Sequence, residues 1–229
     1  MLYVKLNDLT IEKESHKILS HISVELNSNC IGVIGGNGQG KTTLLNAIIE
    51  KDKYLGEITH RPEFSYAGHI SDMNTELYVK EILEYSVINS GTDLWGFEEI
   101  LKVFDLTHLK DHSFNTLSGG EKQRVNLACS LYQKSDLVIW DEPTNYLDPR
   151  HIKSLIDIVL KEKMRRKFLI VSHHMNFIIS VSEMILGLKD RELKFYENTY
   201  TAFDKKLFNE IFDISFNYMI NDQKRSVTI

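Results

Sequence analysis

The stretch Gly35-Gly36-Asn37-Gly38-Gln39-Gly40-Lys41-Thr42-Thr43 fits the pattern G-x-x-x-x-G-K-[ST] and decides the fold of this chain. Before it, residues 30–34 are apolar and suit a buried strand, and after it residues 43–49 carry the one-sided apolar pattern of a helix. Glycines let successive backbone N–H groups turn inward around a polyphosphate, and the helix amino terminus adds partial positive charge. Lys41 is expected to reach the β- and γ-phosphates, and the Thr42 hydroxyl to bind Mg²⁺. The stretch therefore predicts a site for a nucleoside triphosphate.

Composition narrows the class of protein. The 229 residues suit one domain of generous size, and a hydrophobic content of 42% is enough for a core. A net charge of −5 argues against wholesale nucleic-acid binding. Cys30 and Cys129 lack metal-type spacing, which predicts buried free thiols in a reducing compartment. Since the first residues lack a signal-peptide pattern and no apolar run approaches the roughly 18 residues of a membrane span, we expect a cytoplasmic protein or subunit.

Strand and helix patterns alternate along the chain. This alternation predicts an α/β fold, with a mainly parallel sheet covered by helices on both faces and antiparallel strands at the amino terminus. Residues 75–109 have helical periodicity broken at 90–92, which indicates a small helical subdomain inserted into the core. We expect a single domain, 1–229, with these parts: a core at 1–72 and 113–200, a helical subdomain at about 73–135, and a helical tail at 201–229, mainly over 205–221.

Three polar residues follow predicted buried strands. Asp141 closes the apolar run 137–140, where a carboxylate can hold the Mg²⁺ that bridges the phosphates. Glu142, the next residue, is a candidate general base for the attacking water. His173, after the run 168–171, is a candidate hydrogen-bond partner of the γ-phosphate. With Lys41, Glu142 and His173 form the predicted catalytic set.

Four motifs occur in the order and spacing of an ABC-type ATPase domain, a P-loop NTPase: GGNGQGKTT, LSGGEKQR, VIWDEPTN-YLD and VSHH. Over residues 2–200 the chain resembles that family. The resemblance implies Mg-dependent hydrolysis of ATP to ADP and phosphate by two such domains packed head to tail, each ATP lying between one phosphate loop and the other domain's signature. The signature residues Ser118, Gly119, Gly120 and Glu121 would therefore contact the partner's ATP, and Asp148 would lie at the interface between the two domains.

The chain departs from the family pattern at two places. No aromatic residue precedes Ile18 where the family stacks the adenine, and Glu12 and Lys13 occupy that region, which leaves Tyr3 or apolar contacts for the base. His69 stands where the family has the glutamine between core and subdomain, and it is either a further metal ligand or a plain loop histidine. Trp140, in place of the usual aliphatic residue, is expected to pack in the core.

The process that the ATPase drives has two competing predictions. The first is a soluble ABC-F-like protein acting on the ribosome, because PTNYLD, SHHMNF and the segment 195–203 resemble motifs of that class, and the helical stretch 205–221 follows where that class begins its linker. The alternative is the ATP-binding subunit of a membrane transporter, paired with a separate membrane-spanning subunit. Such a subunit would need an apolar groove near His69, for which Tyr78, Leu94, Trp95 and Phe97 are candidates or, equally, core residues. A third, weaker class is a nucleic-acid ATPase that uses the basic run 161–167.

Overall fold

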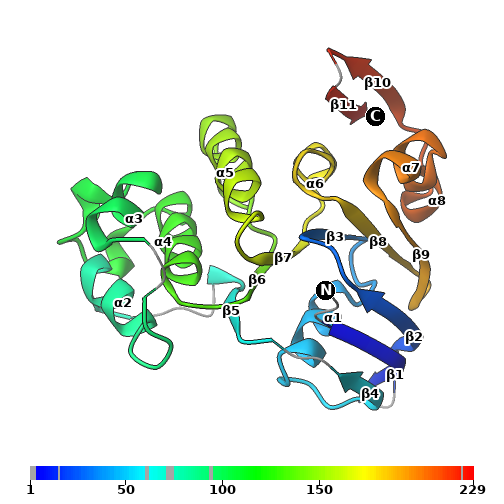
Figure 1. The fold of residues 1–229 in the computed structure, drawn as a ribbon, viewed down its shortest axis with the longest axis horizontal. Helices are drawn as coiled ribbons and strands as arrows, with labels where there is room; N and C mark the ends of the chain where they lie inside the picture. Colours follow the sequence, from blue (N-terminus) through cyan, green and yellow to red (C-terminus); the bar gives the residue numbers. More distant parts are fainter. Residues whose placement is uncertain (1–3, 15, 60–61, 71–74, 93–94, 223) are drawn as a thin grey trace.

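The computed structural model describes residues 4–14, 16–59, 62–70, 75–92, 95–222 and 224–229, and it confirms the α/β architecture (Figure 1). The strands are Val4–Lys13 (β1), His16–Leu26 (β2), Cys30–Ile34 (β3), Leu55–Thr59 (β4), Phe64–Ala67 (β5), Leu137–Asp141 (β6), Lys167–Val171 (β7), Met184–Lys189 (β8), Glu192–Asn198 (β9), Asn217–Asn221 (β10) and Lys224–Thr228 (β11). The helices are Lys41–Ile48 (α1), Val79–Ser86 (α2), Phe97–Val103 (α3), Gly119–Tyr132 (α4), Pro149–Glu162 (α5), Met175–Val181 (α6), Thr199–Asp204 (α7) and Leu207–Phe212 (α8).

The main sheet brings the carboxyl ends of five parallel strands to one edge. In the described part of the chain its order is β5-β6-β7-β3-β8-β9, with parallel pairing from β5 to β8 and an antiparallel edge strand, β9. A second sheet, β2-β1-β4, is antiparallel, as predicted for the amino terminus. Because parallel strands end at the same edge, the residues that follow β3, β6 and β7 come together there.

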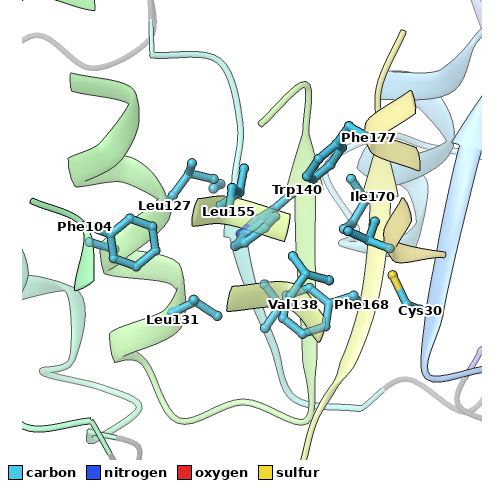
Figure 2. Close-up of a cluster of buried hydrophobic side chains, with 14 of the residues drawn as sticks. Cys30, Phe104, Leu127, Leu131, Val138, Trp140, Leu155, Phe168, Ile170 and Phe177 are labelled. Carbon is cyan, nitrogen blue, oxygen red and sulfur yellow. The ribbon is translucent and has the colours of Figure 1, made fainter. Parts of the chain in front are cut away.

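Side-chain alternation divides the core into two clusters, one on each face of the sheet. Val138 and Trp140 of β6 belong to the cluster that packs against α4, α5 and α6, whereas Leu137 and Ile139 belong to the cluster with α1 and the antiparallel sheet. Figure 2 shows the first cluster, with Trp140 among side chains from α4, α5 and β7. The indole N–H of Trp140 donates to Ser130 Oγ at 2.8 Å, so the predicted core role of this tryptophan is confirmed.

The helices α2, α3 and α4 lie together on the far side of β5 and β6 from the antiparallel sheet (Figure 1). The break expected at 90–92 separates α2 from α3. Between α3 and α4 the chain makes two short 3-10 turns, Thr107–Leu109 and Phe114–Thr116. Cys30 and Cys129 are free and buried, as predicted.

The carboxyl-terminal segment differs from the expected helical tail. Helix α8 ends at Phe212, and the strands β10 and β11 then form an antiparallel hairpin, with Asn217 opposite Thr228. The prediction of helix over 205–221 is therefore wrong beyond α8. The aromatic ring of Tyr218 packs edge-on against Phe203 at 4.9 Å between ring centroids, and this contact holds the hairpin on α7.

Candidate functional site

The phosphate loop joins β3 to α1 at the carboxyl edge of the sheet. Gly38 and Gly40 have φ angles of 74° and 85°, which L side chains rarely adopt, and a Cβ on Gly40 would lie 2.7 Å from Leu19 Cδ2. Lys41 Nζ donates to the carbonyl oxygens of Gly35 at 2.8 Å and Gly36 at 3.0 Å. Burial lowers the pKa of the Lys41 ammonium, and the carboxylates Glu142 and Asp141 oppose that shift. The cation is thus held inside the loop by the carbonyls that a phosphate would replace.

Asp141 ends β6 with its side chain fully buried. Neither of its carboxylate oxygens has a hydrogen-bond partner among the described residues, and His69 Nε2 lies 4.0 Å from Oδ2. Burial raises the pKa of the Asp141 carboxyl, while the Thr42 hydroxyl and His69 oppose the rise. Leaving a buried carboxylate without donors is costly, so this geometry fits a cation.

Glu142 and His173 form a direct pair. Glu142 Oε2 accepts from the His173 backbone N–H at 3.1 Å and lies 2.7 Å from His173 Nδ1. The backbone of Glu142 has a φ of 53°, an uncommon value for a residue other than glycine that turns its carboxylate out of the strand direction. Two strand ends, of β6 and β7, therefore fix one carboxylate and one imidazole against each other.

A cleft of about 510 Å³ opens over the phosphate loop. It is lined by loop and helix residues from Asn37 to Thr43, by His69, Glu142 and His173, and by two residues that the sequence prediction of the site left out, Ile18 and Asn145. Ile18 comes from β2 and adds an apolar side chain to the lining. The signal for Asn145 was its position three residues after Glu142, in the same turn. Tyr3, a candidate for the base, lies outside the described residues.

The signature residues lie at the start of α4 and do not line this cleft. Ser118 caps the helix, since its hydroxyl oxygen accepts from the Glu121 N–H at 3.4 Å. In return, Glu121 Oε2 accepts from the Ser118 N–H and hydroxyl, both at 2.7 Å, which completes a capping box. A Cβ on Gly120 would lie 2.7 Å from the Tyr146 carbonyl oxygen. Ser118, Gly119, Gly120 and Glu121 therefore share an exposed corner with the 142–148 turn, apart from the chain's own phosphate loop.

Two buried amides tie α4 to the nucleotide cleft. Gln123 Nε2 donates to the Pro143 carbonyl at 3.2 Å and lies 3.4 Å from that of Glu142. Asn126 Nδ2 donates to the Gly68 carbonyl at 2.7 Å, directly before His69. A rotation of α4 would thus shift the backbone next to both Glu142 and His69.

Asp148, predicted as interface residue and helix cap, caps α5. Its side chain accepts from the His151 N–H at 2.9 Å, and Pro149 is the first helical residue. The carboxylate remains 56% exposed, so a contact with another chain is open to it.

The donor set fits a magnesium ion bound with phosphates. Asp141 and Thr42 supply one buried carboxylate and one hydroxyl, and His69 Nε2 lies 4.0 Å from Asp141 Oδ2. Among the described residues no group of three or more His, Cys, Asp or Glu side chains is arranged as a self-contained metal centre. That pattern suits Mg²⁺, which takes few protein ligands and fills its coordination with phosphate oxygens and water.

Comparison with known proteins points to one family. Residues 19–145 match the family model described as ABC transporter. The zinc import ATP-binding protein ZnuC of Buchnera aphidicola is 29% identical over 197 residues, which cover 82% of this chain and 82% of the relative.

Solved structures show the same fold. The ATP-binding subunit of an ABC transporter superposes with a TM-score of 0.82 at 20% identity, covering 93% of this chain and 98% of that one. The archaeal ribosome recycling factor aABCE1, solved with the ribosomal stalk protein aP1, has a TM-score of 0.82 at 24% identity, covering 98% of this chain and 44% of that one.

Proposed function

The chain belongs to the ABC transporter family, and we propose that it is the ATP-binding subunit of a membrane transporter. In this role it binds and hydrolyses Mg-ATP as a head-to-tail dimer and is held at the cytoplasmic face by a separate membrane-spanning subunit. Family membership implies ATP hydrolysis, and the roles that we give to individual residues in binding and hydrolysing ATP are our proposal. The proposed binding and hydrolysis of ATP rest on the cleft in which Lys41, Glu142 and His173 converge over the phosphate loop.

In the proposed mechanism the chain's own groups orient a water and hold the phosphates. Lys41 leaves the Gly35 and Gly36 carbonyls for the β- and γ-phosphates, and the loop N–H groups bind the same oxygens. Glu142 accepts a proton from the attacking water, and His173 holds its carboxylate in place. Mg²⁺, held by Thr42 and Asp141, would neutralise charge on the phosphates.

A transporter role is favoured over ribosome work by the relatives. Seven similar curated proteins are named as ATP-binding proteins of transporters, and one further relative, 31% identical over 147 residues, is named ABC transporter E family member 3. The likeness to the ribosome recycling factor reflects the fold alone, because the two share 24% identity. The segment 205–221, whose expected helix favoured the ABC-F class, contains the short helix α8 and the first strand of the hairpin, β10.

The nucleic-acid alternative depends on the basic run 161–167 as a binding surface. The cations of the basic run 161–167 have partners within the chain: Lys163 pairs with Glu183 at 3.5 Å, Lys167 donates to Asn29 at 2.6 Å, and Lys161 lies over the Trp95 ring at 5.0 Å. Arg165 and Arg166 both pair with Glu162. Few of these cations are left for a phosphate backbone.

An exposed apolar surface at α2 is our candidate for the membrane subunit's docking site. Tyr78 is the N-cap of α2, Tyr85 lies in its last turn and Ile88 follows its C-cap, and these side chains are 46%, 60% and 65% exposed. Helix α2 begins ten residues after His69. Of the three groove candidates that the structure describes, Tyr78 is on this surface and the other two are not. Trp95 is buried, Phe97 packs on Tyr132 with ring centroids 6.3 Å apart, and Leu94 lies outside the described residues. None of the helices in the described ranges has the length and apolar character to span a bilayer.

Fractionation of cells separates the two processes. Tagged chains carrying Glu142→Gln are expressed in the native host, lysed with Mg-ATP, and separated into membranes and a sucrose gradient. We expect recovery with membranes, lost in Ile88→Glu and kept in the matched control Leu55→Glu, which alters an equally exposed residue on β4 (65%). Co-migration with ribosomal particles that depends on ATP would overturn the transporter proposal.

A further inference from the structure

A second cavity lies far from the nucleotide cleft, between α5 and the carboxyl-terminal hairpin. Its volume is about 450 Å³, within the range of small-molecule sites. Helix α5 forms one wall, β11 with Tyr200 of α7 forms the other, and α6 forms the floor. Figure 1 shows α6 between α5 and the hairpin.

The lining combines an apolar surface with positive charge. Ile156 and Leu160, one helical turn apart on α5, face the cavity together with Ile179 of α6. Lys153, Lys224 and Arg225 also line it, against one carboxylate, Asp157. Lys153 and Lys224 have no ion-pair partner within 4.0 Å among the described residues, in a chain whose net charge is −5. The ammonium groups of these two lysines are thus available to a ligand.

Arg225 is held in a fixed orientation. Its guanidinium carbon lies 4.2 Å from the centroid of the Tyr200 ring and 5.7 Å from that of Phe203, and Nε lies 3.6 Å from Asp204 Oδ1. Stacking on an aromatic face leaves the planar edge of a guanidinium free to bind an anion. The charge of this arginine is therefore placed before any ligand arrives.

The hairpin wall is anchored to the floor. The side chain of Asn176, on α6, accepts from the Val227 N–H at 2.8 Å and donates to the Val227 carbonyl at 3.1 Å. Val227 itself is buried. A preformed cavity of this kind costs little ordering on binding, which is the usual condition for a small-molecule site.

We propose that this cavity, the hairpin groove, binds a small amphipathic anion. The apolar body of the ligand packs on Ile156, Leu160 and Tyr200, and its carboxylate or other anionic head lies between Lys153 on one wall and Lys224 with Arg225 on the other. A small molecule fits the groove better than an acidic protein surface, because the cations stand on both walls of a cavity of limited volume. Helix α5, one wall, begins directly after Asp148, and α6, the floor, begins two residues after His173, so occupancy of the groove bears on both residues.

The test uses 8-anilinonaphthalene-1-sulfonate, an aromatic body with an anionic head, and the full chain saturated with Mg-ADP to keep the probe out of the nucleotide cleft. We expect one saturable fluorescent site per chain. Lys153→Glu with Lys224→Glu should weaken its affinity tenfold or more, whereas the control pair Lys53→Glu with Lys134→Glu, two exposed lysines elsewhere, should not. Octanoate should displace the probe, and octanol at the same concentration should not.

Two results would overturn the groove as an anion site: probe affinity unchanged in the groove variant, or equal displacement by octanol and octanoate. Circular dichroism and Mg-ADP affinity check that the variants are folded. If the charge reversals unfold the chain, Lys153→Gln with Lys224→Gln removes the charges without introducing new ones, and its unchanged probe affinity would be equally decisive. Failure of the groove leaves the ATPase proposal intact, because none of these residues lines the nucleotide cleft.

Discussion

The phosphate-loop half and the signature half of this ATPase are built in opposite ways. Around the phosphate loop, charged groups are buried and turned toward one cleft: Lys41 and Asp141 are 9% and 2% exposed. At the signature, Ser118 and Glu121 lie at an exposed corner and satisfy each other's hydrogen bonds. In the phosphate-loop half the charged groups face a ligand site of the same chain. In the signature half the polar groups already satisfy each other's hydrogen bonds without a ligand.

The difference between the two halves leads us to propose that one chain is insufficient. The signature residues do not line the chain's own cleft. Gln123 and Asn126 nevertheless connect their helix to the Pro143 and Gly68 carbonyls, each one residue from a residue that lines the cleft, Glu142 or His69. A ligand contacted by the signature from outside would therefore be sensed at the chain's own catalytic carboxylate. In the proposed head-to-tail dimer this arrangement would couple the two sites, because each subunit would act on the partner's ATP and respond at its own site.

The largest effect is expected in the phosphate-loop half. Glu142→Gln should retain Mg-ATP affinity and lower turnover by about 10²–10⁴-fold, because the water loses its base while the phosphate contacts remain. Phosphate release and equilibrium nucleotide binding measure the two properties separately. The control Glu63→Gln alters an exposed carboxylate elsewhere and should match the parent. Parental turnover in Glu142→Gln would show that another group is the base.

Complementation between chains tests the division into halves directly. Lys41→Ala should lack nucleotide affinity, and Ser118→Asn, which keeps a helix cap, should bind ATP but turn it over about 100-fold more slowly, in keeping with the loss of a group that acts on charge in the transition state. In an equal mixture half of the dimers are mixed, and each mixed dimer has one intact site of two. Turnover should thus return to roughly a quarter of the parental value.

Absence of any recovery in the mixture, with dimers shown to exchange, would mean that phosphate loop and signature act within one chain. Unchanged ATP affinity in Lys41→Ala would instead contradict the role proposed for this lysine. The first outcome would contradict the action of the signature on the partner's nucleotide, and the second would contradict the binding of phosphate by Lys41.

A smaller effect concerns stability. Asp141→Asn removes a buried carboxylate whose oxygens have no hydrogen-bond partner in the described part of the chain, so it should raise the free energy of unfolding without nucleotide by about 0.5–2 kcal/mol. The same change should abolish the further stabilisation by Mg-ATP over ATP alone. Thermal unfolding with and without nucleotide and metal measures both. Destabilisation of the nucleotide-free chain would show that the carboxylate is satisfied without a cation.

The sequence predicted the elements that local patterns determine. The phosphate loop, the buried strands and the polar residues that end them are all short-range signals, and parallel strands bring their ends together by geometry. Ile18 and Asn145 escaped prediction, because lining a cleft depends on how β2 and the 142–148 turn approach the loop. The basic run failed as a surface signal since its partners, Asn29 and Glu183, are distant in sequence.

The hairpin shows the limit of periodicity. Leu207, Phe208 and Ile211 have helical spacing and form α8, but the pattern then changes to the alternation of Tyr218 and Ile220, followed by the turn formers Asn221 and Asp222. A helix could not have continued through that turn signal. The change of period was visible in the sequence, and the error lay in extending the helix past it.

The smallest effect is expected at the signature. Hydrogen bonds from the Ser118 hydroxyl and N–H lower the pKa of the Glu121 carboxyl below its ordinary value of 4.5. A carboxyl whose pKa is lower in the folded than in the unfolded state contributes stability that is present above pH 4.5 and lost as the pH falls through the folded-state pKa. Glu121→Ala should cost about 0.5–1 kcal/mol at pH 7 and nothing in strong acid, and backbone amide exchange at the start of α4 reports it. Because the cap is internal, the cost should be the same with and without ATP in a monomer. If ATP raised the cost in monomers, the signature would be contacting its own chain's nucleotide, and the contrast between the two halves would fail.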